Sequence, residues 1–268
     1  MTPVLSLTRH GEPGGLPLVL LHAFPLDSRM WDEVVALLPE LDVITLDAPG
    51  FGGSPTPLAV AERLGRPTEP ALETYAAAVV DSLRSTGVER AVVAGLSMGG
   101  YAALALAERH RSLLAGIGLL DTKASADDDA ARANRLRVAE AAAGDAGSEA
   151  VAPMVDQVLG ETTHAQRPEL VERMRALLGE APPVGIAWAQ RAMAVRPDRT
   201  AALEDLDVPA LVLRGAEDGM SPQSALNAMA EALSDVEVVV VPRSGHMSAL
   251  EAPDQVADAL RALHARCR

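Results

Sequence analysis

The chain of 268 residues has few aromatic side chains, with two Trp, two Tyr and two Phe. Its core must therefore be packed mainly with Leu, Val, Ala and nine Met. The one cysteine, Cys267, stands next to last, which excludes a disulfide within the chain and a cysteine metal cluster. We interpret Cys267 as an incidental terminal residue.

Long apolar runs and positive charge are also scarce. The run LPLVLLHAF is much shorter than the roughly 20 residues that a membrane helix needs. The N-terminal stretch MTPVLSLTRHGEPGG lacks the basic start and the long apolar segment of a signal peptide. A formal net charge of −14 disfavours contact with phosphate backbones and anionic lipids. We expect a soluble, cytoplasmic protein with neither nucleic acid nor a membrane as partner.

Short apolar runs alternate with helical patterns along the chain. The runs lack polar alternation, which is typical of strands buried on both faces of a parallel sheet. They are Leu18–Leu21, Val43–Leu46, Ala91–Leu96, Gly116–Leu120, Ala210–Leu213 and Val236–Val241. Helical patterns cover Ser28–Leu38, Leu72–Leu83, Tyr101–Glu108, Gln223–Leu233 and Asp254–Leu263. The alternation predicts an α/β fold with a mostly parallel, doubly wound sheet and helices on both faces.

One long segment contains no strand-like run. Helical patterns follow one another at Asp128–Ala143, Glu149–Leu159, Pro168–Leu178 and Gly185–Val195. We therefore predict a core of residues 1–122 and 201–268, with residues 123–200 inserted as a helical cap over the sheet.

A lone serine stands where an apolar run ends and a helical pattern begins. The segment Gly95-Leu96-Ser97-Met98-Gly99 matches G-x-S-x-G in a strand–turn–helix context. On so tight a turn, side chains at the two glycine positions would collide with the neighbouring strand and helix. The Ser97 hydroxyl would then stand clear above the sheet at a helix N-terminus, where the dipole favours negative charge. The alternative is a serine that caps an ordinary helix, with glycines used for close packing.

A serine hydroxyl is a weak nucleophile without a base. His246 follows the run Val236–Val241 on a Ser-Gly turn, and it comes last in the chain order nucleophile, acid, base. His22 also follows a strand-like run. We interpret the other histidines as solvated or partly buried polar residues: His10, His110, His164 and His264.

The base needs a carboxylate that fixes its tautomer. We favour Asp218, just after the run Ala210–Leu213, and keep Asp121, which closes the run Gly116–Leu120, as the alternative. The neighbouring Glu217 should point away from the site.

The turn after the apolar run Leu18–Leu21 is suited to a role other than proton transfer. In His22-Ala23-Phe24-Pro25 we expect a backbone N–H that faces an oxyanion from the side opposite the Met98 N–H. His22 would hold this loop by hydrogen bonds instead of transferring protons. Asp47, in the glycine-rich loop after the next strand, would fix backbone N–H groups.

Taken together, these motifs resemble the α/β-hydrolase family over nearly the whole chain. The resemblance rests on HAFP at 22–25, DAPGFGGS at 47–54, GLSMGG at 95–100, GAED at 215–218 and GH at 245–246. It implies Ser97 as nucleophile, His246 as general base and then acid, and Asp218 as the group that orients it. It also implies an oxyanion hole formed by the N–H groups of Phe24 and Met98. The chain departs from the family at Ala23, where glycine is usual.

Within the family, the chain most resembles the 3-oxoadipate enol-lactonase-like and carboxylesterase branch. This rests on the weaker motifs LLDTKA at 119–124 and GIAWAQRAMAVRPDRT at 185–200. A carboxylate-bearing lactone would meet positive charge at Arg191 and Arg196, whose alternative interpretation is that of solvated helix faces.

Methionines follow the three expected catalytic residues closely and suggest an apolar, adaptable pocket. We expect a substrate-binding set of His22, Met30, Met220, Met247 and Trp188, to which Met98 adds. Ordinary core packing is the alternative for each of them.

The resulting hypothesis is a serine hydrolase without cofactor or metal that cleaves a small carboxylic ester or lactone through an acyl-enzyme. Two alternatives remain open at this point. The same triad can hydrolyse a carbon–carbon bond in a vinylogous diketone or perform perhydrolysis. A homologue of the same fold can also bind a ligand without turnover.

Overall fold

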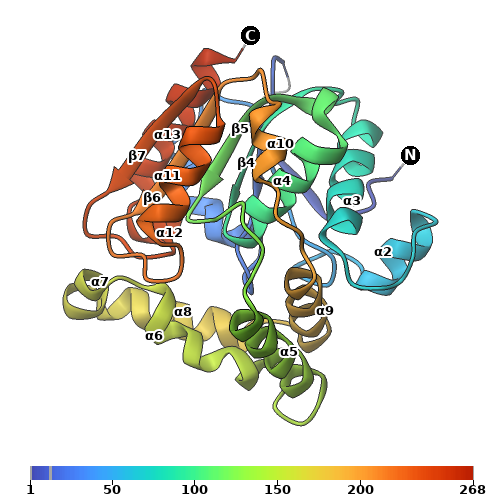
Figure 1. Cartoon of the computed structure of the whole chain (residues 1–268), viewed down its shortest axis with the longest axis vertical. Coiled ribbons are helices and arrows are strands. Elements are labelled where there is room, and N and C mark those ends of the chain that lie inside the picture. The colour runs from blue at the N-terminus through green and yellow to red at the C-terminus, as the bar shows by residue number, and fades with distance from the viewer. Residues whose placement is uncertain (1, 12–13, 268) are drawn as a thin grey trace.

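The structure is a computed structural model that describes residues 2–11 and 14–267, so Met1 and Arg268 at the ends of the predicted core lie outside it. In the described part, seven strands form one sheet in the order β1-β3-β2-β4-β5-β6-β7 (Figure 1). β1 pairs antiparallel with β3, whereas every other neighbouring pair is parallel. The strands are β1 (Leu7–His10), β2 (Leu18–Leu21), β3 (Val43–Leu46), β4 (Ala91–Leu96), β5 (Leu114–Leu120), β6 (Ala210–Gly215) and β7 (Val236–Val241).

Helices surround this sheet, which confirms the predicted α/β fold class. α4 packs against β2, β4 and β5, and α13 packs against β5, β6 and β7. The α-helices of the core are α1 (Asp32–Ala36), α2 (Pro57–Arg63), α3 (Leu72–Ser85), α4 (Met98–Arg109), α10 (Thr200–Glu204, which begins at the last residue of the segment 123–200), α11 (Gln223–Ala232), α12 (Ser248–Glu251) and α13 (Pro253–Arg266). Short 3-10 turns add η1 (Ser28–Trp31) and η2 (Arg111–Leu113). None of the described helices is long and apolar enough to cross a membrane.

Every apolar run that was expected to be a strand lies in one. The elements that were not predicted include β1 and α2. β1 reads Leu-Thr-Arg-His and is half-exposed at the antiparallel edge of the sheet, so its sequence has no apolar run. The short helix α2 begins with Pro57 directly after its cap Thr56.

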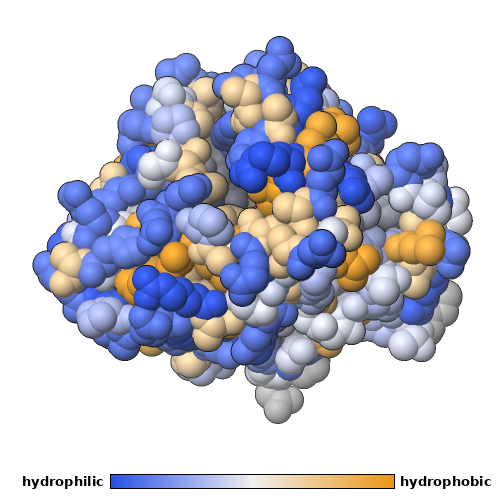
Figure 2. Space-filling model, turned by 90° about the horizontal axis from the view of Figure 1, so that it is seen from below, coloured by the Kyte–Doolittle hydropathy of each residue, from blue (hydrophilic) through white to orange (hydrophobic). Residues whose placement is uncertain are grey.

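Between β5 and β6 the described chain forms helices and loops only. We call residues 123–200 the helical insertion. It lies below the carboxyl ends of the strands in Figure 1, and Figure 2 shows the mostly hydrophilic face seen from that side. Its helices are α5 (Asp129–Ala143), η3 (Gly147–Met154), α6 (Val155–Val158), α7 (Glu161–Gln166), α8 (Pro168–Glu180) and α9 (Pro183–Ala194).

A buried carboxylate, Glu251, fastens the insertion to the loop that follows β7. One of its oxygens accepts the N–H groups of Gly245 at 2.9 Å and Met247 at 3.2 Å. The other accepts the Gly160 N–H at 2.8 Å and the Thr163 hydroxyl at 2.6 Å. These four donors are buried away from water, so the Glu251 carboxylate is the acceptor that satisfies them.

We predict that Glu251→Ala lowers the free energy of unfolding by about 2 kcal/mol or more, since several buried donors lose their acceptor. Glu251→Gln should lose less, because its amide keeps one oxygen. The matched control is Glu231→Ala, which removes an exposed glutamate on α11. Thermal unfolding of the three variants checks this, and equal melting temperatures for Glu251→Ala and Glu231→Ala would contradict it.

Candidate active site

Ser97 occupies the turn between β4 and α4 in a strained conformation. Its backbone has φ 53° and ψ −109°, a region that residues other than glycine rarely adopt. Surrounding bonds hold it there: its N–H donates to the Leu120 carbonyl at 2.9 Å, and its carbonyl accepts the Thr122 hydroxyl at 2.9 Å. Main-chain and side-chain contacts with the end of β5 therefore fix the direction of the Ser97 side chain.

The glycines beside Ser97 are needed because the turn has no room for side chains. A Cβ on Gly95 would lie 2.1 Å from the Gly99 carbonyl carbon. A Cβ on Gly99 would lie 2.1 Å from the carbonyl oxygen of Leu21 on β2. The crowding expected from the sequence is therefore present on both sides of the serine.

The loops after β6 and β7 bring two further side chains to Ser97. His246 Nε2 lies 2.9 Å from the Ser97 hydroxyl oxygen, and His246 Nδ1 lies 2.9 Å from Asp218 Oδ2. The other oxygen of Asp218 accepts the N–H groups of Met220 at 2.7 Å and Ser221 at 3.0 Å. The result is a continuous hydrogen-bonded chain from carboxylate to imidazole to hydroxyl.

The electrostatics of this chain favour the charged imidazolium. Burial alone lowers the pKa of His246, but the charge and hydrogen bond of Asp218 outweigh it and raise the pKa above the usual 6.5. Burial likewise opposes ionisation of Asp218, yet His246 and two N–H donors lower the pKa of this carboxyl below 3.8. Each partner therefore stabilises the charged form of the other.

Asp121, the alternative acid, is buried nearby but contacts other groups. Its carboxylate accepts the Gly215 N–H at 2.8 Å and the Ser248 hydroxyl. Its carbonyl accepts the Ser221 hydroxyl at 3.0 Å. Burial, followed by the charge of Asp218, raises the pKa of Asp121 to about 7. Asp121 therefore links the loops that carry Asp218 and His246, whereas Asp218 itself contacts the imidazole.

His22 is fully buried behind the loop that follows β2. Its Nε2 accepts the Ala48 N–H at 2.8 Å, which leaves Nδ1 to donate to the Ala23 carbonyl at 2.9 Å. Burial lowers the pKa of His22, so the ring stays neutral and fixes the loop. The Ala23 N–H, at the position where glycine is usual in the family, points to the sulfur of Met30 at 3.1 Å.

Two backbone donors near Ser97 are uncommitted. In the described part of the chain, neither the Phe24 N–H nor the Met98 N–H donates to another group. Met98 is the first residue of α4, where the helix leaves an N–H free. Such paired donors are the kind of group that stabilises an oxyanion.

A cavity of about 350 Å³ opens over these groups, between the core and the helical insertion. Ser97, His246, Phe24 and Met220 belong to its lining, as expected from the sequence. The other predicted pocket residues do not belong to it. All are buried and lie outside that lining: His22, Met30, Met98, Met247 and Trp188.

Most of the polar lining that the insertion supplies was not predicted from the sequence. Lys123, Asp127, Arg135 and Gln190 all line the cavity. Of the two arginines proposed from the sequence, Arg191 is exposed, and Arg196 is 4% exposed and pairs with Asp127.

Two other predictions about neighbouring loops agree with the contacts. Asp47 accepts the N–H groups of Ser28 at 2.9 Å and Gly53 at 2.8 Å, as expected of a structural residue. Glu217 points away from His246 and accepts the N–H of Thr162 at 2.9 Å.

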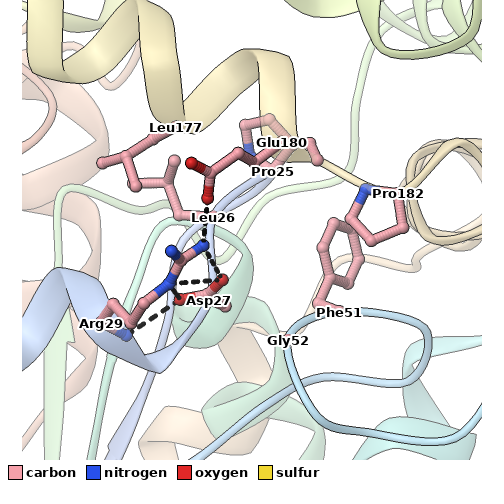
Figure 3. A pocket seen from close by; sticks show the side chains of 10 residues that line it. Pro25, Leu26, Asp27, Arg29, Phe51, Gly52, Leu177, Glu180 and Pro182 are labelled. Carbon is pink, nitrogen blue, oxygen red and sulfur yellow. Dashed lines mark hydrogen bonds and ion pairs between the residues drawn. The ribbon is translucent and has the colours of Figure 1, made fainter.

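A second cavity, of about 140 Å³, lies where α8 meets the loops after β2 and β3 (Figure 3). Within it, Arg29 pairs with Asp27 at 2.7 Å and with Glu180 of the insertion at 2.8 Å. Ser97, Asp218 and His246 are not in its lining, so it is a junction between core and insertion.

Comparison with known proteins places this geometry in context. Residues 17–253 match the model of a family described as alpha/beta hydrolase fold. A 2-succinyl-6-hydroxy-2,4-cyclohexadiene-1-carboxylate synthase from Enterobacter sp. is 32% identical over 263 residues, covering 94% of this chain and 93% of that protein. The 3-oxoadipate enol-lactonase 1 of Acinetobacter baylyi is 25% identical, with 94% and 89% covered. The malate-bound structure of a thermophilic esterase from Thermogutta terrifontis has a TM-score of 0.88 and 37% identity, covering 96% of this chain and 92% of that one.

We predict that the pKa of the His246 imidazole, followed by NMR, lies above 6.5 in the native protein and falls in Asp218→Asn. The amide has no charge to offset burial, which favours the neutral ring. Protonation of the native ring is thus complete only below that raised pKa, and the neutral base accumulates above it. Asp81→Asn, on α3, is the control. An unchanged pKa in Asp218→Asn would show that Asp218 does not control the ring.

Proposed function

Because the chain belongs to the α/β-hydrolase fold family, we propose that it is a cofactor-free serine hydrolase that cleaves a small carboxylic ester or lactone. The observation that carries the proposal is the hydrogen-bonded chain Ser97–His246–Asp218 at the wall of a cavity. The names of the lactonase and esterase relatives support hydrolytic activity.

In the proposed reaction, Ser97 Oγ attacks the carbonyl carbon while His246 Nε2 takes the hydroxyl proton. Asp218 stabilises the imidazolium, and the N–H groups of Phe24 and Met98 hold the oxyanion. The tetrahedral intermediate expels the alkoxide, which receives the proton from His246, and an acyl-Ser97 ester remains. His246 then deprotonates a water that attacks this ester, and the carboxylic acid leaves as Ser97 regains its proton.

The insertion would act as a cap that sets the size of the substrate. At about 350 Å³ the cavity is near the lower end of the roughly 300–1,000 Å³ range of ligand pockets, which favours a small substrate. The malate-bound state of the Thermogutta esterase is a reason to include half-esters of dicarboxylic acids among the substrates assayed.

We predict that Ser97→Ala lowers kcat for 4-nitrophenyl esters by about 10⁴-fold or more, leaving the residual effect of the oxyanion donors and binding. The measurement is steady-state hydrolysis of 4-nitrophenyl esters of graded acyl length and of a few lactones. Ser112→Ala, at an exposed serine in η2, is the matched control and should keep native activity.

A fluorophosphonate probe separates the remaining possibilities. Labelling of Ser97 without ester turnover would favour carbon–carbon bond hydrolysis or perhydrolysis, which a diketone and a peroxide assay would test. Neither labelling nor turnover would favour a protein that binds a ligand without catalysis. Full esterase activity in Ser97→Ala would overturn the proposal.

A further inference from the structure

The cavity over Ser97 contains an excess of positive charge, although the whole chain is strongly acidic. Its charged lining residues, besides the proposed base, are Lys123, Arg135, Arg137 and Asp127. Lys123 lies in the loop between β5 and α5 and is the only lysine in the sequence, while the two arginines lie on α5. Because the whole protein has a net charge of −14, a net positive charge around this cavity needs a physical explanation.

Asp127 does not neutralise this positive charge, because it is already paired with a further cation, Arg196. Arg196 binds Asp127 through two nitrogens, with Nη1 at 2.7 Å from Oδ2 and Nη2 at 2.9 Å from Oδ1. This bidentate pair is buried, and the guanidinium stacks over the Tyr101 ring with 4.0 Å between its carbon and the ring centroid. A bidentate pair of this kind neutralises the carboxylate and gives each of its oxygens a hydrogen bond.

Lys123 and Arg135 share that same carboxylate as additional partners. The Lys123 ammonium lies 3.0 Å from Asp127 Oδ1, and the Arg135 Nε contacts Oδ2. Arg135 Nη1 also reaches Gln190 Oε1 at 3.2 Å. Three cations thus share one carboxylate, so two positive charges have no counter-charge within the cluster.

Both of these side chains keep donors available. An ammonium carries three N–H groups, and Asp127 is the one ion-pair partner of Lys123 among the described residues. Its side chain is 23% exposed, and it lines the same cavity as Ser97. A group bound there would face partly dehydrated cations, which attract an anion more strongly than exposed ones do.

We propose that Lys123 and Arg135 form an anion subsite that selects substrates with a carboxylate at the end remote from the bond that is cleaved. The subsite rests on the proposed function, since it assigns a substrate class to the same cavity. A half-ester of a dicarboxylic acid has this chemistry. Its carboxylate lies between Lys123 and Arg135 while its ester carbonyl faces Ser97.

The test compares mono-4-nitrophenyl esters of succinic, glutaric and adipic acid with neutral 4-nitrophenyl esters of equal chain length. We predict that Lys123→Met lowers the ratio of kcat/KM between charged and neutral esters by about tenfold, because a charge-assisted bond is lost. The change should lie mainly in KM, and added salt should narrow the difference between native protein and variant. Arg135→Met provides a second, independent variant with the same expected direction.

Arg132→Met is the matched control, because Arg132 is an exposed cation on the same helix and lies outside the cavity lining. It should leave the ratio unchanged. An equal ratio in native protein and in both Lys123→Met and Arg135→Met would overturn the subsite while leaving ester hydrolysis intact. Stronger competitive inhibition by inorganic phosphate than by glutarate would also contradict a carboxylate subsite.

Calorimetric titration with glutarate keeps the two proposals separate. Binding to native protein and its loss in Lys123→Met would support the subsite even if no ester were cleaved. Absence of binding to native protein, together with Ser97-dependent hydrolysis of neutral esters, would reject the subsite alone.

Discussion

The tight turn between β4 and α4 is the constraint on which the rest of the site depends. Gly95 packs against Gly99, and Gly99 packs against the backbone of β2, so no side chain fits at either position. The strained backbone of Ser97 costs on the order of 1–3 kcal/mol and persists because hydrogen bonds with Leu120, the last residue of β5, and with Thr122 in the following loop hold it. This backbone conformation places the Ser97 hydroxyl at the carboxyl ends of the parallel strands, where the loops after β6 and β7 also lie.

Parallel pairing then brings the remaining groups to that edge. β6 lies beside β5 and β7 lies beside β6, so the loops with Asp218 and His246 approach Ser97 from the same side of β4. The His246 loop is in turn bound to the insertion, since the N–H groups of His246 and Met247 both donate to the Val158 carbonyl. The same hydrogen bonds thus position the imidazole and the part of the insertion that covers the cavity. A displacement of the insertion would therefore change the position of His246, the proposed base.

The sequence predicted the sheet well because its strands are buried on both faces and therefore form uninterrupted apolar runs. That Ser97, His246 and Asp218 lie close together could be predicted for a similar reason, since each stands at or soon after the carboxyl end of a strand. β1 was missed because it is an edge strand with polar residues. The pocket was predicted less well: methionines close in sequence to Asp218 and His246 point in different directions, so Met220 reaches the cavity and Met247 is buried. The cationic lining depends on how α5 and α9 pack together, which no local pattern encodes, although the single lysine at the start of the insertion was a usable signal.

The central claim is that Ser97 forms a covalent acyl intermediate, and rapid chemical quench tests it most directly. Native protein is mixed with 4-nitrophenyl acetate, quenched in acid at increasing times, digested and analysed by mass spectrometry. The account predicts a burst of nitrophenol stoichiometric with protein and an acetyl group on the peptide that contains Ser97. A burst with the acetyl group on another residue, or turnover with no acylated peptide at any time, would contradict it.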